Sequence, residues 1–174
     1  MRRRDVRGFT LLEVLIALVV LGFGMLSLAR TMGRASQEQV EAYQRAQAIV
    51  LAQEMVDRIN NDQRNAARYV GSYVPDGRTE DCTLAATLWE RNGCEWRNRL
   101  LGVDVRDGAR VIGAPMASRG CIANPAPNVY VVAVAWQGVL PTEAPDSACG
   151  AGEFDSEANR RVYSTVLQIA TLGA

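Results

Sequence analysis

An uninterrupted apolar run near the N-terminus constrains this chain more than any other feature. The 21 residues from Phe9 to Ala29 contain a single ionisable side chain, that of Glu13. This is about the length that a helix needs to cross the hydrocarbon core of a bilayer. Four arginines precede the run and predict that the N-terminus stays in the cytoplasm. We therefore expect one membrane-spanning helix, with the rest of the chain outside the cytoplasm.

The carboxylate of Glu13 is costly in such a run. Insertion scales give a charge at the helix centre a cost of about 2.5–3.5 kcal/mol, and less near an end. A charge kept in a membrane segment indicates a functional site, whose partner would be a positive group from another chain. A secretory signal peptide and a plain signal anchor are alternatives, but both leave Glu13 unexplained. A soluble core helix would not be so uniformly apolar.

The order Gly8-Phe9-Thr10-Leu11-Leu12-Glu13-Val14 resembles the N-terminal signature of type IV prepilins and type II secretion pseudopilins. In that family, a prepilin peptidase in the membrane cuts after the glycine and methylates the new N-terminus. The resemblance implies cleavage between Gly8 and Phe9, N-methylation of Phe9, and retention of the apolar run. It also implies that Glu13 acts in assembly by pairing with the Phe9 ammonium of an adjoining subunit.

The composition excludes many functions. The chain has no histidine and no lysine, so all 19 basic residues are arginine. Triads that depend on histidine, Schiff-base lysines and P-loop lysines are therefore impossible. The formal net charge is zero, and removal of the leader, which carries +3, leaves the mature chain near −3. We expect no enzyme, no cofactor and no nucleic-acid partner.

Four cysteines lie in the part expected outside the cytoplasm: Cys82, Cys94, Cys121 and Cys149. An even number in an exported domain indicates two disulfides. Three connectivities are possible, and we favour the most local one, Cys82–Cys94 with Cys121–Cys149. Zinc is the alternative, but the spacings are wide and there is no histidine, so we expect no metal.

The hydrophobic pattern predicts an α+β fold. Residues 30–68 continue the first helix into water, with an apolar stripe on one face, and the helix ends between 61 and 68. Residues 69–80 form a loop, and residues 82–91 form a short helix that Asn92-Gly93 stops. That break allows Cys82 to reach Cys94.

The period changes to two after Val103. A short hairpin is expected around Asp107-Gly108, followed by a loop at 114–127. Two strong strands, 128–136 and 161–170, should pair antiparallel on either side of a loop at 138–152. The amphipathic half of the first helix would then pack on a small C-terminal antiparallel sheet.

Further features resemble PilV-type minor pilins: the helix segment Ala48–Ile59, Cys82 followed by a short amphipathic piece with Asn92-Gly93-Cys94 and Trp96, and the strand Val129–Trp136 that ends in Trp136-Gln137-Gly138. The resemblance implies a minor pilin that primes pilus assembly and sits at the tip. Its partners would be other minor pilins, the pilus tip protein and the inner-membrane assembly platform. The expected parts are a leader (1–8), a membrane helix (9–29), its amphipathic continuation (30–68) and a periplasmic pilin domain (69–174). The subunit would cross the inner membrane once and then enter the pilus at the cell surface.

Other functions stay open. A type II secretion minor pseudopilin is the nearest alternative, and a tip receptor, adhesion or DNA-uptake module would need a basic or aromatic surface patch. An anchored periplasmic enzyme is a weaker alternative. We interpret the tryptophans as core residues and the pairs Arg97/Arg99 and Arg160/Arg161 as solvated faces. The acidic residues between Asp146 and Glu157 lack the EF-hand spacing of a calcium loop.

Overall fold

The computed structural model describes residues 10–103, 106–107, 110–111 and 113–170. The expected cleavage residues Gly8 and Phe9 lie outside them. The chain divides into two units, Met1–Gln39 and Val40–Ala174.

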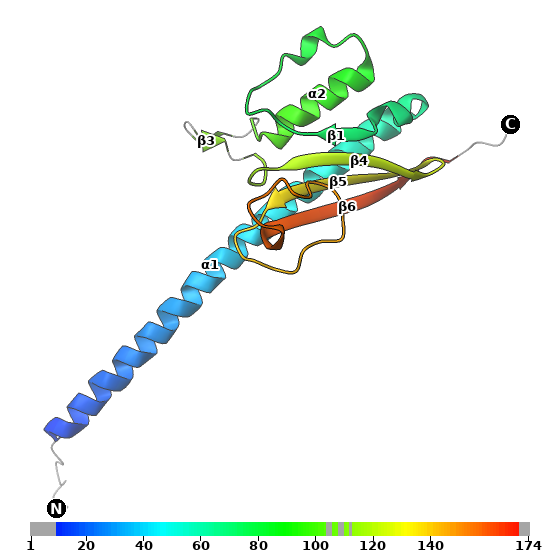
Figure 1. Cartoon of the computed structure of the whole chain (residues 1–174). Helices are drawn as coiled ribbons and strands as arrows, with labels where there is room; N and C mark the ends of the chain where they lie inside the picture. Colours follow the sequence, from blue (N-terminus) through cyan, green and yellow to red (C-terminus); the bar gives the residue numbers. More distant parts are fainter. Residues whose placement is uncertain (1–9, 104–105, 108–109, 112, 171–174) are drawn as a thin grey trace, which may run out of the picture. The chain divides into compact units, whose positions relative to one another are not determined.

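Helix α1 extends from Leu11 to Asn61 and belongs to both units (Figure 1). In the first unit it is long and apolar enough to span a membrane, and its most apolar window buries nothing against the rest of the protein. In the second unit the same helix is amphipathic. Its buried residues lie along one face, three or four positions apart except for one adjacent pair: Gln44, Ala48, Leu51, Ala52, Met55 and Ile59. The predicted change from a uniformly apolar helix to an amphipathic one is confirmed in the pattern of burial.

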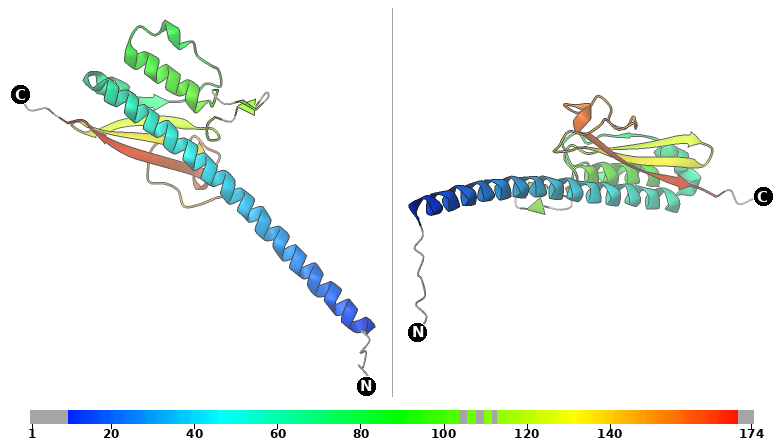
Figure 2. Two further views of the ribbon diagram at one scale, coloured as in Figure 1. Left: turned by 180° about the vertical axis from the view of Figure 1, so that it is seen from behind. Right: turned by 90° about the horizontal axis from the view of Figure 1, so that it is seen from below.

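The second unit contains a four-stranded antiparallel sheet in the order β1-β4-β5-β6. Its strands are β1 (Gly71–Tyr73), β4 (Arg119–Ala126), β5 (Val129–Gln137) and β6 (Arg160–Gln168). One face of the sheet packs on the Val40–Asn61 part of α1 (Figure 2). This is the expected α+β arrangement, and β5 and β6 pair antiparallel as predicted.

Two strands lie in segments that were predicted from the sequence to be loops. The strand β4 lies in the predicted loop 114–127, and β1 lies in the predicted loop 69–80. The sequence of β4 carries Gly120 and Pro125 and lacks a clear apolar alternation, so its strand character comes from pairing with β5, for example Ile122 opposite Val132. The strand β1 has three residues and is too short for a sequence pattern.

The predicted helix stop at Asn92-Gly93 is wrong. Helix α2 extends from Leu88 to Leu100 through both residues, and it begins at Thr87 with a capping box completed by Glu90. The preceding 3-10 helix, Cys82–Leu84, is separate, so the chain turns before α2 rather than within it. A Cβ at position 93 would lie 2.9 Å from Cε1 of Tyr73. The glycine therefore serves to admit the Tyr73 ring, not to end the helix.

The remaining elements are short. Helix α1 is followed by a 3-10 helix at Gln63–Tyr69, and the expected hairpin is present as β2 (Arg106–Asp107) and β3 (Arg110–Val111). A third 3-10 helix, Glu157–Asn159, precedes β6. The core between α1, α2 and the sheet includes the fully buried side chains of Trp96 and Tyr69.

Candidate assembly site

The first turn of α1 is held by Thr10. Its hydroxyl accepts a hydrogen bond from the backbone N–H of Glu13 at 3.3 Å, and its carbonyl accepts one from the same N–H at 3.1 Å. A threonine that accepts from the third helical N–H is an N-cap, and a glutamate at that third position is the capping-box spacing. This capping role was not predicted from the sequence, although Thr10-Leu11-Leu12-Glu13 has the spacing of a capping box.

The carboxylate of Glu13 thus lies in the first helical turn and is exposed. A negative charge there is favoured by the partial positive charge of the helix N-terminus, by about 0.3–1 kcal/mol at exposed sites. This offsets part of the cost of placing the charge in an apolar segment. A subunit that has not yet assembled can therefore tolerate the carboxylate of Glu13 at this position. The carboxylate remains available to a cation from another chain.

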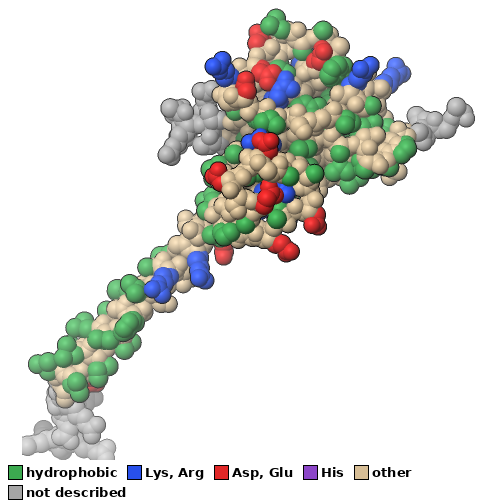
Figure 3. Space-filling model, viewed as in Figure 1, with side chains coloured by type: hydrophobic (Ala, Val, Ile, Leu, Met, Phe, Trp, Pro, Cys, Tyr) green, Lys and Arg blue, Asp and Glu red, His purple; other side chains and the backbone are tan. Residues whose placement is uncertain are grey.

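Apolar side chains cover the N-terminal part of α1 on the face that Figure 3 shows. Large hydrophobic residues from Leu11 to Met32 are each at least half exposed. Soluble monomers rarely expose a contiguous apolar surface of this kind, which marks a membrane or protein contact. The most exposed of them are Leu11, Leu12, Val20, Phe23, Met25 and Met32.

Two disulfides stabilise the second unit. Cys82 is bonded to Cys94 with their Cα atoms 5.6 Å apart, and Cys121 is bonded to Cys149 with a Cα separation of 5.8 Å. This is the pairing favoured from the sequence. The second bond ties β4 to the loop between β5 and β6.

The predicted solvated faces are wrong for Arg97, Arg160 and Arg161, which are partly or fully buried, whereas Arg99 is exposed as predicted. Arg160 is buried, and its guanidinium donates to the carbonyls of Pro145, Ser147 and Cys149 and to the carboxylate of Glu157. Arg97 donates two hydrogen bonds to the carboxylate of Glu80, which holds the pKa of Glu80 below its usual value. These side chains organise loops because a guanidinium offers five donors in a fixed plane.

Two of the acidic residues between Asp146 and Glu157 form ion pairs with arginines. Glu153 pairs with Arg119 at 2.9 Å and Glu157 with Arg160 at 2.6 Å. A backbone hydrogen bond from Gly152 and the contact with Arg160 lower the pKa of Glu157. Among the described residues, no group of three or more potential ligands is placed to hold a metal ion.

The tryptophans lie in or beside the core, as interpreted from the sequence. Trp96 and Trp136 are buried, and Trp89 packs against the same cluster partly exposed. Among the described residues they form no exposed aromatic platform of the kind that sugar or single-stranded nucleic-acid binding would use.

Residues 3–29 match the family model of the prokaryotic N-terminal methylation motif. The match includes the expected cleavage residues, Glu13 and the apolar part of α1. No curated protein and no solved structure matches the chain. The motif supports a type IV pilin-like or pseudopilin-like protein, suggests a structural protein, and is consistent with membrane anchoring by the apolar helix.

Proposed function

We propose that the chain is a minor pilin of a type IV pilus, of the PilV type. The observation that carries the proposal is the methylation motif at residues 3–29, which includes the apolar part of a helix that continues into a disulfide-bonded α+β domain. A subunit of this form helps to prime the pilus together with other minor pilins and the tip protein, on the inner-membrane assembly platform.

The proposed path of the subunit follows from its parts. The leader, residues 1–8, stays in the cytoplasm and is removed by prepilin peptidase, and Phe9 becomes the methylated N-terminus. Residues 9–29 span the inner membrane, and residues 30–68 and 69–174 lie in the periplasm. The helix then passes from lipid into the filament, where Glu13 pairs with the Phe9 ammonium of an adjoining subunit. Pairing removes the cost of a lone charge among apolar helices.

Processing is tested with Gly8→Arg. The peptidase needs close backbone access at this position, which the absence of a Cβ provides. In membranes that contain prepilin peptidase, we expect the wild-type chain to be shortened by eight residues and the variant to keep its leader. Arg3→Gln is the matched control, because it alters the leader away from the cleavage site and should be cut. Normal cleavage of Gly8→Arg would contradict the assignment.

A type II secretion minor pseudopilin carries the same processing signal and is the second candidate. The two functions differ in the phenotype of a strain lacking the gene. Loss of surface pili with normal protein secretion supports the pilus, whereas accumulation of secreted proteins in the periplasm supports the secretion system.

A further inference from the structure

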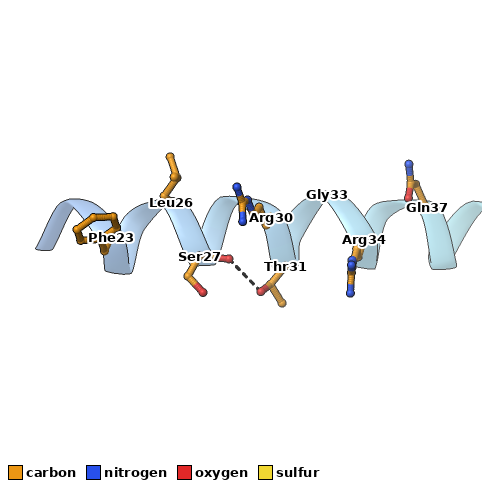
Figure 4. Close-up of a pocket in the computed structure, with 8 residues that line it drawn as sticks. All are labelled: Phe23, Leu26, Ser27, Arg30, Thr31, Gly33, Arg34 and Gln37. Atoms are coloured by element: carbon orange, nitrogen blue, oxygen red, sulfur yellow. Dashed lines mark hydrogen bonds between the residues drawn. The ribbon is translucent and has the colours of Figure 1, made fainter. Parts of the chain in front are cut away.

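Two arginines lie immediately after the apolar part of α1. Arg30 comes directly after Ala29, and Arg34 lies one helical turn later. Figure 4 shows them beyond Phe23 and Leu26 on the same helix. The hydrogen bond drawn there runs from the hydroxyl of Thr31 to the carbonyl of Ser27, and neither guanidinium takes part in it.

The length of the apolar segment fixes where these arginines lie in a bilayer. The residues from Leu11 to Ala29 extend about 28 Å at 1.5 Å per residue, close to the roughly 30 Å of a hydrocarbon core. The Cα of Arg30 is then about 1.5 Å beyond the core, and that of Arg34 about 7.5 Å. The headgroup layer is about 5–7 Å thick on each side. Both guanidinium groups therefore reach this layer.

We propose that Arg30 and Arg34 bind the phosphates of anionic phospholipid headgroups at the outer face of the inner membrane, and so set the depth of the helix before assembly. The proposal rests on the membrane-anchored function given above. A guanidinium matches a phosphate with two parallel N–H donors, which suits arginine to this contact better than lysine.

The spacing of the two arginines suits the phosphates of a lipid layer. Arg30 and Arg34 are four positions apart, so they lie on one face of the helix with their Cα atoms about 6 Å apart along its axis. Each can contact its own phosphate. Gly33 lies between them, and a Cβ there would meet nothing within 4 Å, so the helix surface beside the arginines is open to a headgroup.

Cleavage of the leader increases the importance of this pair. Before cleavage, the arginines of the leader hold the N-terminus inside. After cleavage, Arg30 and Arg34 are the only basic side chains between Phe9 and Gln44. They then remain as the cationic anchor nearest the membrane, and they resist movement of the helix toward the cytoplasm because a charge enters hydrocarbon at high cost.

The experiment uses the processed full-length chain in nanodiscs of phosphatidylcholine with a minor share of phosphatidylglycerol. Native mass spectrometry counts the lipids retained on the protein. We expect the wild-type chain to retain phosphatidylglycerol several-fold above its share in the bilayer, and the double variant R30Q/R34Q to lose this enrichment. The variant R30K/R34K keeps both charges without the forked donors and should be intermediate.

The matched control is R45Q, which removes one exposed arginine about 16 Å further along α1. It should retain the wild-type enrichment. Equal enrichment in R30Q/R34Q and the wild type, or an equal loss in R45Q, would overturn the proposal. Alkaline extraction of membranes separates the two hypotheses: release of the wild-type chain contradicts the anchored function itself, whereas a retained chain without arginine-dependent enrichment contradicts only the lipid contact.

Discussion

The indole Nε1 of Trp96 donates a hydrogen bond to the backbone carbonyl of Leu51 at 2.9 Å. The two residues are 45 positions apart in the chain and join α2 to the sheet-packing part of α1. Trp96 is fully buried, and its ring meets that of Tyr73 edge-on with centroids 5.0 Å apart. This contact places α2, which carries Cys94 of the first disulfide, against α1. The relative orientation of α1 and α2 could not be predicted from the sequence.

Trp96→Phe should lower the free energy of unfolding by about 1–3 kcal/mol, because it removes one hydrogen bond and leaves a cavity where the second ring stood. Urea unfolding of the full chain in detergent, followed by fluorescence of the remaining tryptophans, measures the change. Trp89→Phe is the control, since Trp89 is partly exposed, and it should cost less. Equal losses for both variants would contradict a special role for Trp96.

Gly120→Ala should destabilise the second unit strongly. A Cβ at this position in β4 would overlap Cζ3 and Cη2 of Trp96 and lie 3.0 Å from Cδ1 of Leu100. Overpacking of this kind costs about 1–3 kcal/mol or more. Gly33→Ala is the matched control: its Cβ meets nothing within 4 Å, and alanine improves helix propensity by about 1 kcal/mol. A shift of the unfolding midpoint in Gly33→Ala alone would refute the predicted clash.

Arg160→Met should cost about 3–5 kcal/mol. The guanidinium is buried and serves three carbonyls of the loop that carries Cys149, and its removal leaves these acceptors and Glu157 without their partner. Arg91→Met removes an exposed arginine from α2 and should change stability by less than about 0.5 kcal/mol. Limited proteolysis within residues 139–156 gives a local measurement, and unchanged protection in Arg160→Met would contradict the prediction.

Stability should fall at high pH because of Tyr69. Burial raises the pKa of its hydroxyl to about 12, and the contact with Asp62 adds to the effect. In the unfolded chain the pKa is about 10. The native state disfavours the phenolate of Tyr69. The contribution of Tyr69 to the free energy of unfolding is therefore complete below pH 10 and is lost, by about 2–3 kcal/mol, as the pH rises through 12.

Unfolding midpoints measured between pH 9 and 12 test this prediction. Tyr69→Phe should flatten the decline, although some slope remains because burial also raises the pKa of Tyr73. A decline as steep as that of the wild type would show that Tyr69 does not cause it.

Glu13→Gln and Thr10→Val separate two roles of the first helical turn. Glu13→Gln keeps a residue compatible with the capping box but removes the charge, whereas Thr10→Val removes the cap and keeps the charge. If pairing with an adjoining Phe9 ammonium drives assembly, Glu13→Gln should be cleaved normally yet be depleted at least several-fold from sheared pili. Thr10→Val should assemble better than Glu13→Gln. The reverse order would indicate that Glu13 acts through the helix cap.

The uniformly apolar part of α1, its amphipathic continuation and the pair β5–β6 could be predicted because each follows from a local pattern. Uniform apolarity, a helical stripe and dense β-branched residues act through neighbours a few positions apart. The short β1 and the glycine- and proline-bearing β4 have no such pattern. They become strands because β4 pairs with β5 and β1 with β4, and partners distant in the chain are invisible to a local rule.

The sequence by itself determined the parts that act alone: the processing motif, a segment apolar enough for a membrane, and the exclusion of chemistry that needs histidine or lysine. The tertiary structure decided what depends on distant contacts. Asn92-Gly93 lies inside α2 and does not end a helix, and Gly93 leaves room for the ring of Tyr73. Arg160 is buried, although its sequence position indicates only that it is charged. A buried charge requires several acceptors to converge, and here they come from a loop more than ten residues away. The Thr10–Glu13 cap needed no tertiary contact, because both of its partners lie within one helical turn.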